Sequence, residues 1–248
     1  MLVHGCPPPP DTSADAARMW RTARDYFLRR GYPRKWIRVV TYDAPVCASN
    51  GRLANELAVV IKDLLARTGA AKVDIVAHSM GALAARLYVL DKGRTFVRDF
   101  VALAGPNHGA ETALIGWPLR TFLGGAYEQL QEGSPAYACG PLAHHEIQTR
   151  LNGCLTPSGR IEDVDETPFG VEDGGSIRYL SISNDVDELV VPSQSACLNQ
   201  AFMNDCSDSV NVRLSLKPEP GGPLIHERYT SDRRVLALVY AHITRRID

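Results

Sequence analysis

Short apolar runs alternate with longer amphipathic segments along most of this chain. The short runs are rich in Val and Ile, which is typical of strands that are buried on both faces of a sheet. The longer segments carry apolar residues three and four positions apart and predict helices packed against those faces. The alternation predicts an α/β fold with a mostly parallel, six-stranded sheet covered by helices on both sides. Strands are expected at 1–4, 36–42, 97–103, 177–183 and 210–216, with one more beginning at Val73.

The expected helices begin and end at recognisable residues. A helix at about 16–30 has Asp11, Thr12 or Ser13 as its candidate cap and ends at Gly31. The next helix, at 53–68, ends at Gly69, where glycine accommodates the left-handed residue that commonly terminates a helix. Two more helices are expected, one after Ser79 and one at 232–246.

The periodic pattern stops between about residues 110 and 175, where Gly, Pro and polar residues are frequent. More than sixty residues between two core strands is too long for a plain loop. We therefore expect a single domain, residues 1–248, with a cap or lid insertion at about 110–175. Aromatic side chains of the insertion either line an acyl pocket or form a small core of their own; they include Trp117, Phe122, Tyr127 and Phe169.

The strand that begins at Val73 leads into the sequence AHSMG at 77–81, and an alanine-rich helix follows. This is a variant of the nucleophile elbow, in which a serine occupies a sharp turn between a strand and a helix. Small residues on both sides of Ser79 leave room for neighbouring backbone, with Ala77 in place of the more usual glycine. The helix N-terminus directs N–H groups and partial positive charge towards an oxyanion formed at Ser79. The alternative is a serine that only caps the helix.

A serine nucleophile needs a histidine base that is oriented by a carboxylate. With this elbow, the acid and then the histidine follow the serine on loops after later strands. Of the seven histidines, only His226 lies between the last expected strand and the last helix. Asp185 and Asp187 both follow the strand at 177–183. Asp187 is favoured because it precedes the apolar segment 189–191, and Asp185 stays the alternative.

Composition narrows the class of protein. Hydrophobic residues make up 45% of the 248 residues, which is ordinary for a globular chain with a sizeable core. The net charge of −1 argues against nucleic acids or anionic membranes as partners held by bulk charge. No apolar run approaches the roughly 18 residues that a membrane-spanning helix needs.

The six cysteines are an even number without a CxxC pair, which argues against a zinc site or a thioredoxin-type motif. Three disulfides are expected, and with them an oxidising compartment; the alternative is six reduced thiols in a cytosolic enzyme. We therefore expect a secreted or periplasmic protein. No signal peptide precedes the first strand, so we expect either that the chain was trimmed or that the natural gene start lies upstream. The expected pairs are Cys6–Cys47, Cys139–Cys154 and Cys197–Cys206.

Four stretches together resemble bacterial class 2 triacylglycerol lipases of the alpha/beta-hydrolase superfamily: LVHG at 2–5, AHSMG at 77–81, LAGPNHG at 103–109 and DELVVP at 187–192. The resemblance covers most of the core but not the region 110–175. It implies that Ser79 is the nucleophile, His226 the base and Asp187 the acid. The amides of Cys6 and Met80 would then form the oxyanion hole.

Two departures from the family pattern concern the residues around the elbow. Ala82 stands where the family often has a second glycine, and four prolines follow Cys6. We expect a serine hydrolase that cleaves carboxylic esters, as a lipase or esterase, with no metal or organic cofactor. A monomer acting on a lipid, a short-chain ester or a polyester is favoured. The alternatives are an extracellular polyhydroxyalkanoate-type depolymerase, a thioesterase or acyltransferase, and an inactive hydrolase that only binds.

Overall fold

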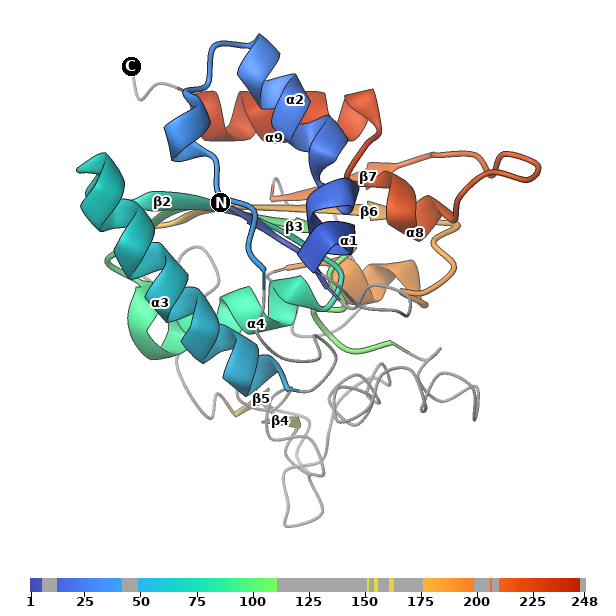
Figure 1. The fold of residues 1–248 in the computed structure, drawn as a ribbon. Helices are drawn as coiled ribbons and strands as arrows, with labels where there is room; N and C mark the ends of the chain where they lie inside the picture. Colours follow the sequence, from blue (N-terminus) through green and yellow to red (C-terminus); the bar gives the residue numbers. More distant parts are fainter. Residues whose placement is uncertain are drawn as a thin grey trace.

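A five-stranded parallel sheet lies at the centre of the molecule (Figure 1). The computed structural model describes residues 1–5, 13–41, 49–110, 151, 154–155, 161–162, 176–198, 206 and 210–245. The expected α/β architecture is confirmed, with five strands in the described part of the parallel sheet where six were expected. In the order β1-β2-β3-β6-β7, the strands are β1 (Leu2–Val3), β2 (Val73–His78), β3 (Val97–Leu103), β6 (Arg178–Asn184) and β7 (Asn211–Leu214).

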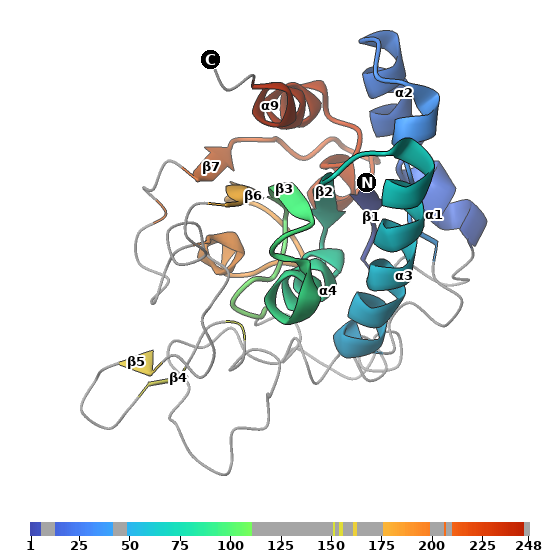
Figure 2. The same ribbon diagram turned by 90° about the vertical axis from the view of Figure 1, so that its left-hand side faces the viewer.

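Alternate residues of β1, β2, β3 and β6 enter two cores, one on each face of the sheet. Ile75 of β2 packs with helices α3 (Asn50–Thr68) and α4 (Gly81–Tyr88). Val76 packs on the opposite face with α2 (Arg21–Arg29) and α9 (Arg233–Thr244). Figures 1 and 2 show these two pairs of helices on opposite sides of the sheet. Because both faces are covered, the strands appear in the sequence as continuous apolar runs.

Shorter elements connect the core. They are α1 (Ser13–Met19), 3-10 helices at Arg34–Trp36 and Ser193–Ala196, a π-helical turn at Val89–Gly93 and the one-turn helix α8 (Ile225–Arg228). None of the described helices has the length and apolar character needed to cross a membrane.

Part of the expected insertion forms a separate two-stranded antiparallel sheet. It pairs β4 (Cys154–Leu155) with β5 (Ile161–Glu162). The rest of 111–175, apart from Leu151, lies outside the described residues, so the cap or lid stays a prediction.

The disulfide between Cys197 and Cys206 is present, with a Cα–Cα distance of 5.8 Å, which confirms that pair. The other two expected pairs involve Cys6, Cys47 and Cys139, which lie outside the described residues, so those pairs remain predictions.

The helix expected at 16–30 is divided at Trp20. The Trp20 backbone has φ −88° and ψ 3°, which departs from helical values, and it separates α1 from α2. Its N–H still donates to the Ala16 carbonyl at 3.2 Å, and its carbonyl accepts from the Arg24 N–H at 2.9 Å. The indole is completely buried in the core shared with α9. Tertiary burial of this side chain therefore outweighs the local preference for one continuous helix.

The prediction of a strand at 36–42 is wrong. A 3-10 turn follows Pro33, and the only ladder contact in the described part of 36–42 is a parallel bridge between Val39 and Leu2. β1 has two residues, so Leu2 alone offers hydrogen bonds to a neighbour on that side. Its N–H donates to Arg38 at 2.7 Å, and its carbonyl accepts from Val40 at 2.8 Å.

This bridge still fixes the topology of the sheet. Val39 lies on one side of β1 and β2 lies on the other. After β1, the chain therefore first adds a neighbour on one side of this strand, at Val39, and later adds β2 on the other side. In open α/β sheets, ligands bind at the carboxyl ends of the strands where the order reverses in this way. Gly5 and Ser79 follow the two strands at this point.

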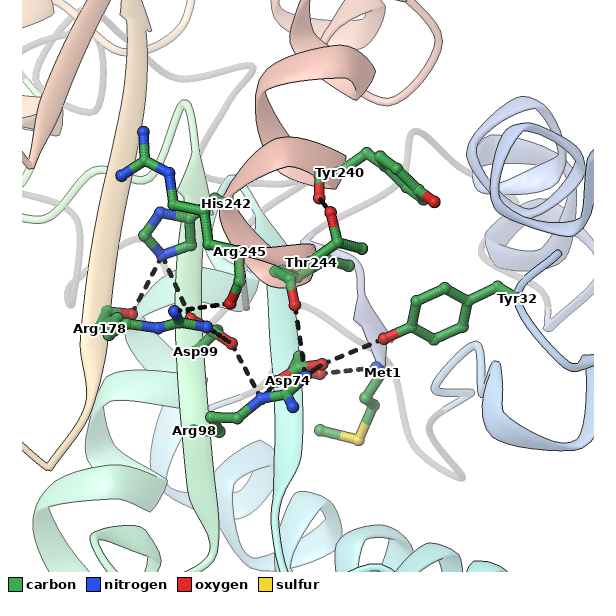
Figure 3. A network of polar contacts seen from close by, with 11 residues as sticks. Met1, Tyr32, Asp74, Arg98, Asp99, Arg178, Tyr240, His242, Thr244 and Arg245 are labelled. Atoms are coloured by element: carbon green, nitrogen blue, oxygen red, sulfur yellow. Dashed lines mark hydrogen bonds and ion pairs between the residues drawn. The ribbon is translucent and has the colours of Figure 1, made fainter. Parts of the chain in front are cut away.

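The amino ends of β2, β3 and β6 carry a network of charged side chains (Figure 3). Asp99 is completely buried and accepts hydrogen bonds from Arg178 Nε and Nη2 at 2.7 and 2.9 Å, and from Arg98 Nε at 3.1 Å. Arg98 also binds both carboxylate oxygens of Asp74, at 2.8 and 2.6 Å, and this hydrogen-bonded pair raises the pKa of Arg98. The Tyr32 hydroxyl donates to Asp74 at 3.3 Å.

The same arginines also bind the end of α9. Arg98 donates to the Ile243 carbonyl at 3.4 Å, and Arg178 donates to the Arg245 carbonyl at 3.2 Å. The last carbonyls of a helix have no partner within the helix and carry partial negative charge. The network therefore ties three strands to the C-terminus of α9 as well as neutralising Asp99.

Candidate active site

Ser79 lies in a sharp turn between β2 and α4. Its φ is +56°, a left-handed conformation that residues other than glycine rarely adopt. The surrounding backbone holds this conformation, because the Ser79 N–H donates to Leu103 of β3 and its carbonyl accepts from Ala82, both at 2.9 Å. Strained backbone of this kind persists only where neighbouring contacts determine it, and it is concentrated at functional sites.

Two glycines let the end of β1 approach this turn closely. A Cβ atom at Gly81 would lie 2.6 Å from the His4 carbonyl oxygen, and one at Gly5 would lie 2.7 Å from the Ser79 Cβ. Either contact is too short for a side chain. The loop that leaves β1 therefore begins directly beside Ser79.

Of the two candidates for the oxyanion hole, Met80 and Cys6, only Met80 lies within the described residues. Met80 is buried at the N-terminal cap position of α4, next to Ser79. Cys6 lies outside the described residues. Its contribution stays a prediction.

His226 comes to Ser79 from the far end of the chain. Its Nε2 lies 2.8 Å from Ser79 Oγ, and its Nδ1 lies 3.0 and 3.1 Å from the two carboxylate oxygens of Asp187. A carboxylate can only accept, so Nδ1 carries the proton and Nε2 is the acceptor facing the Ser79 hydroxyl. The side chains of His226 and Asp187 are only 5% and 2% exposed. His226 belongs to the helical turn α8, where the sequence predicted a loop.

Asp187 and Asp185 have different surroundings. Asp187 Oδ1 accepts the N–H groups of Leu189 and Val190, both at 2.9 Å, in a tight turn that directs the carboxylate at His226. Burial alone would raise the pKa of Asp187, but the hydrogen bonds from His226 and from these amides lower it below its usual value. Asp185 is half exposed and pairs with Arg213. Of the two aspartates, the structure brings Asp187 to His226.

Sequence reasoning assigned no role to two side chains that bind the His226 region. His78 Nε2 lies 2.7 Å from the His226 carbonyl oxygen, and the two imidazole centroids are 4.8 Å apart. Glu188 accepts the N–H groups of Ile225 at 3.0 Å and of His226 at 3.2 Å. Their one signal in the sequence was position, since His78 precedes Ser79 and Glu188 follows Asp187.

Burial decides the protonation of the aromatic groups around His226. Burial first, and the neighbouring His226 second, lower the pKa of His78 to about 3, so this imidazole is neutral near pH 7. Tyr229 packs against both histidines, with ring centroids 6.3 and 6.5 Å away. Burial and the negative charge of Asp187 raise the pKa of Tyr229.

The loop after β3 is anchored by buried polar groups. Asn107 Nδ2 donates to the Ala196 carbonyl at 2.7 Å, and the His108 N–H donates to Ser195 at 2.9 Å. Arg86 of α4 donates to the Asn107 carbonyl at 2.8 Å. Burial, followed by the charge of Arg86, lowers the pKa of His108 to about 3. The loop beside the Ser79 turn is therefore tied to α4 and to the 3-10 helix at Ser193–Ala196.

Ala82, which departs from the family pattern, has a structural counterpart in the same loop. A Cβ atom at Gly105 would lie 2.7 Å from the Ala82 Cβ. The methyl group of Ala82 therefore occupies space that a side chain at position 105 would need.

A cavity of about 270 Å³ opens at the opposite, amino end of the sheet. Its lining includes Phe27, Tyr32, Trp36 and Asp74. Asp74 precedes Ser79 by five residues, or about 16 Å along a strand, so this cavity is separate from the cluster at Ser79. In the part of the chain that the structure describes, no three His, Cys, Asp or Glu side chains are grouped to hold a metal ion.

Comparison with known proteins addresses the family and the fold of this chain. A family model described as "Alpha/beta hydrolase family" matches residues 1–239, nearly the whole chain. No curated relative matches the chain.

Solved structures with a similar fold include the lin2722 gene product of Listeria innocua, at 15% identity and a TM-score of 0.55, covering 100% of this chain and 94% of that one. Lipase B of Aspergillus fumigatus is 19% identical with a TM-score of 0.55, covering 96% of this chain and 50% of the lipase. At these identities the likeness shows the fold alone.

Proposed function

The chain belongs to the alpha/beta hydrolase family, and on this premise we propose that it is a serine hydrolase that cleaves carboxylic esters. The observation that carries the proposal is the double contact of His226, with Nε2 at 2.8 Å from Ser79 Oγ and Nδ1 at 3.0 Å from Asp187. A hydroxyl, a base and an orienting carboxylate within hydrogen-bond reach can activate a serine for acyl transfer. The sequence motifs support a lipase or esterase similar to the bacterial class 2 triacylglycerol lipases.

The reaction proceeds through an acyl-enzyme. Ser79 Oγ attacks the ester carbonyl carbon while His226 Nε2 accepts the hydroxyl proton. Asp187 holds the imidazole and stabilises its positive charge without taking the proton itself. As the tetrahedral intermediate collapses, the Nε2 proton passes to the oxygen of the leaving alcohol. Water then attacks the acyl group with His226 as base, which releases the carboxylic acid and restores Ser79.

The developing oxyanion needs hydrogen-bond donors near Ser79. We assign this role to the amides of Met80 and Cys6, each worth about 3–4 kcal/mol of transition-state stabilisation by analogy with other hydrolases. The position of Met80 at the start of α4 supports the first donor. The close approach of Gly5 to Ser79 supports the second, because Cys6 is the next residue. This scheme requires neither a metal ion nor an organic cofactor.

The disulfide bears on where the enzyme works. Disulfides such as Cys197–Cys206 form and persist mainly in oxidising compartments. This supports a secreted or periplasmic enzyme, in keeping with hydrolysis of external esters.

A panel of p-nitrophenyl esters of increasing acyl length tests the proposal. Ser79→Ala should lower kcat/KM by at least about a thousandfold, as in other serine hydrolases that lose the nucleophile. Ser231→Ala removes a hydroxyl that donates to the Arg228 carbonyl and serves as the matched control, with activity unchanged. A fluorophosphonate should label Ser79 in the wild type. Activity near the wild-type level in Ser79→Ala would contradict the proposal. Emulsified triglyceride and polyester film then distinguish the two ester classes.

A further inference from the structure

The backbone of His226 is bound on both sides of its Cα atom. Its N–H donates to Glu188 Oε2 at 3.2 Å, and its carbonyl oxygen lies 2.7 Å from His78 Nε2. The side chain has its own partners, Asp187 and Ser79. Every polar group of this residue, in the main chain and the side chain, therefore has a hydrogen-bond partner.

Glu188 supplies what the short helix α8 lacks. The first N–H groups of any helix have no partner within the helix. Leu224 occupies the N-cap position of α8 and offers no side-chain acceptor. Glu188 takes this place from a distant loop, with one carboxylate oxygen on the Ile225 N–H and the other on the His226 N–H. Its carboxylate thereby fixes the first turn of the helix that carries the base.

His78 binds the other side of the same residue. A carbonyl oxygen can only accept, so His78 Nε2 must carry the proton. The low pKa of this buried imidazole keeps it in that neutral form. His78 is the last residue of β2, directly before Ser79. The strand that presents the nucleophile therefore also holds the backbone of the base.

We infer that Glu188 and His78 are positioning residues, which hold the His226 backbone so that Nε2 stays within proton-transfer distance of Ser79. The inference rests on the proposed function. Two pairs of consecutive residues hold His226. In the first pair, His78 contacts the His226 carbonyl and Ser79 contacts Nε2. In the second pair, Glu188 accepts the His226 N–H and Asp187 accepts the hydrogen bond from Nδ1. Proton transfer needs heavy atoms about 2.6–3.2 Å apart. A misplacement of about 1 Å can cost a hundredfold in rate.

The test separates the rate per competent site from the number of competent sites. Labelling Ser79 to completion with a fluorophosphonate counts competent sites, and hydrolysis of p-nitrophenyl butyrate gives kcat and KM. Glu188→Ala should lower kcat per labelled site about tenfold to a hundredfold, with KM and the labelled fraction unchanged. Glu188→Gln retains one acceptor oxygen and should lose less. Glu227→Gln makes the same change at an exposed position of α8 and is the control.

The same design applies to the second positioning residue. His78→Gln keeps an N–H donor, whereas His78→Phe keeps a ring without one. The phenylalanine variant should lose more kcat per labelled site than the glutamine variant.

Three results would overturn the inference. The first is a Glu188→Ala enzyme whose kcat per labelled site stays within about twofold of wild type. The second is a rate loss matched by an equal loss of labelled serine, because this shows unfolding in place of misplacement. The third is a His78→Phe enzyme as active per site as His78→Gln. If the wild type does not label, or Ser79→Ala remains active, the proposed function itself fails and the inference with it.

Discussion

The two ends of the central sheet both bury a carboxylate, but different groups bind it. At the amino end, two arginines surround Asp99 with three hydrogen bonds (Figure 3). At the carboxyl end, Asp187 accepts from one imidazole and two backbone amides. Each carboxylate is satisfied, and the two side chains are almost equally hidden from water, at 0% and 2% exposed.

The difference lies in what the imidazole beside each carboxylate reaches. The arginines that bind Asp99 carry fixed charges, and His242, the imidazole of that network, lies 3.6 Å from Asp99 through the same nitrogen that faces the Arg178 carbonyl oxygen. The His226 imidazole instead has Nδ1 on Asp187 and Nε2 on the Ser79 hydroxyl, so it can take the hydroxyl proton. The cavity of about 270 Å³ lies at the end with fixed charges. A buried carboxylate or a cavity therefore does not identify a reactive site unless an imidazole also joins the carboxylate to a nucleophilic hydroxyl.

The largest expected effect distinguishes the two aspartates near the carboxyl end. Asp187→Asn should lower kcat/KM about ten-thousandfold, because the amide favours the wrong tautomer of His226. Asp185→Asn makes the same change in a half-exposed residue paired with Arg213 and should stay within about twofold of wild type. Ester hydrolysis by purified, folded variants measures both. Equal losses in the two variants would refute the assignment of the acid.

The second prediction moves to the amino end and should alter stability without altering chemistry. Asp99→Asn places an amide nitrogen against arginine donors and should cost about 3 kcal/mol of unfolding free energy. Asp63→Asn breaks only the exposed pair with Arg67 and should cost less than about 0.5 kcal/mol. Urea unfolding gives both values. The activity of each labelled Ser79 should not change, and a fall in Asp99→Asn would mean that the two ends are coupled.

The third prediction concerns acid. His78 and His108 have pKa values of about 3 in the folded protein and about 6.5 when unfolded. Between these values the unfolded chain binds more protons, so stability should fall as pH decreases from 6.5 towards 3. Each histidine contributes about 1.4 kcal/mol per pH unit. The lowered pKa of His242, at the amino end, acts in the same direction.

Denaturant midpoints at pH 7, 5.5 and 4.5 measure this slope. His108→Gln should remove about one histidine's share of it, whatever the stability of the variant at pH 7. A wild-type stability that does not change between pH 6.5 and 4.5 would rule out the buried neutral histidines.

The smallest expected effect concerns Tyr32, which lies at the edge of the charged network around Asp74 and Asp99. The variant tests how much its hydroxyl adds to the stability of that network. Tyr32→Phe removes one 3.3 Å hydrogen bond to Asp74, which keeps both contacts with Arg98. The unfolding free energy should fall by about 1 kcal/mol or less. Burial first, and the charge of Asp74 second, raise the pKa of Tyr32 to about 12. An ordinary tyrosine pKa in a spectroscopic titration would show that Tyr32 is not buried beside Asp74 in solution.

Sequence patterns predicted the carboxyl end of the sheet better than the amino end. The turn at Ser79 has local signals, namely an apolar strand, small flanking residues and an alanine-rich helix. His226 was chosen from chain order, and Asp187 was favoured over Asp185 because an apolar segment follows it. The structure brings Asp187 and His226 together, while their catalytic roles remain our proposal. By contrast, Asp99 and Arg178 are 79 residues apart, and no local pattern indicates that they pair.

Other features depend on relations that a linear pattern does not contain. The strand expected at 36–42 failed because pairing was limited by the two-residue length of β1. The hydrogen bonds of Glu188 reach residues of α8 that are 37 and 38 positions away, so its role was not visible from its place beside Asp187. The Cys197–Cys206 pair was predictable because the two residues are separated by only nine positions.

The close approach of Ala82 and Gly105 restricts how this sequence can evolve. With a methyl group at position 82, an added Cβ at position 105 would lie 2.7 Å from it. A lineage that moves the methyl group from one position to the other must therefore pass through an intermediate with glycine at both. The order of the two substitutions is thereby fixed, and a survey of related sequences should rarely find alanine at both positions together.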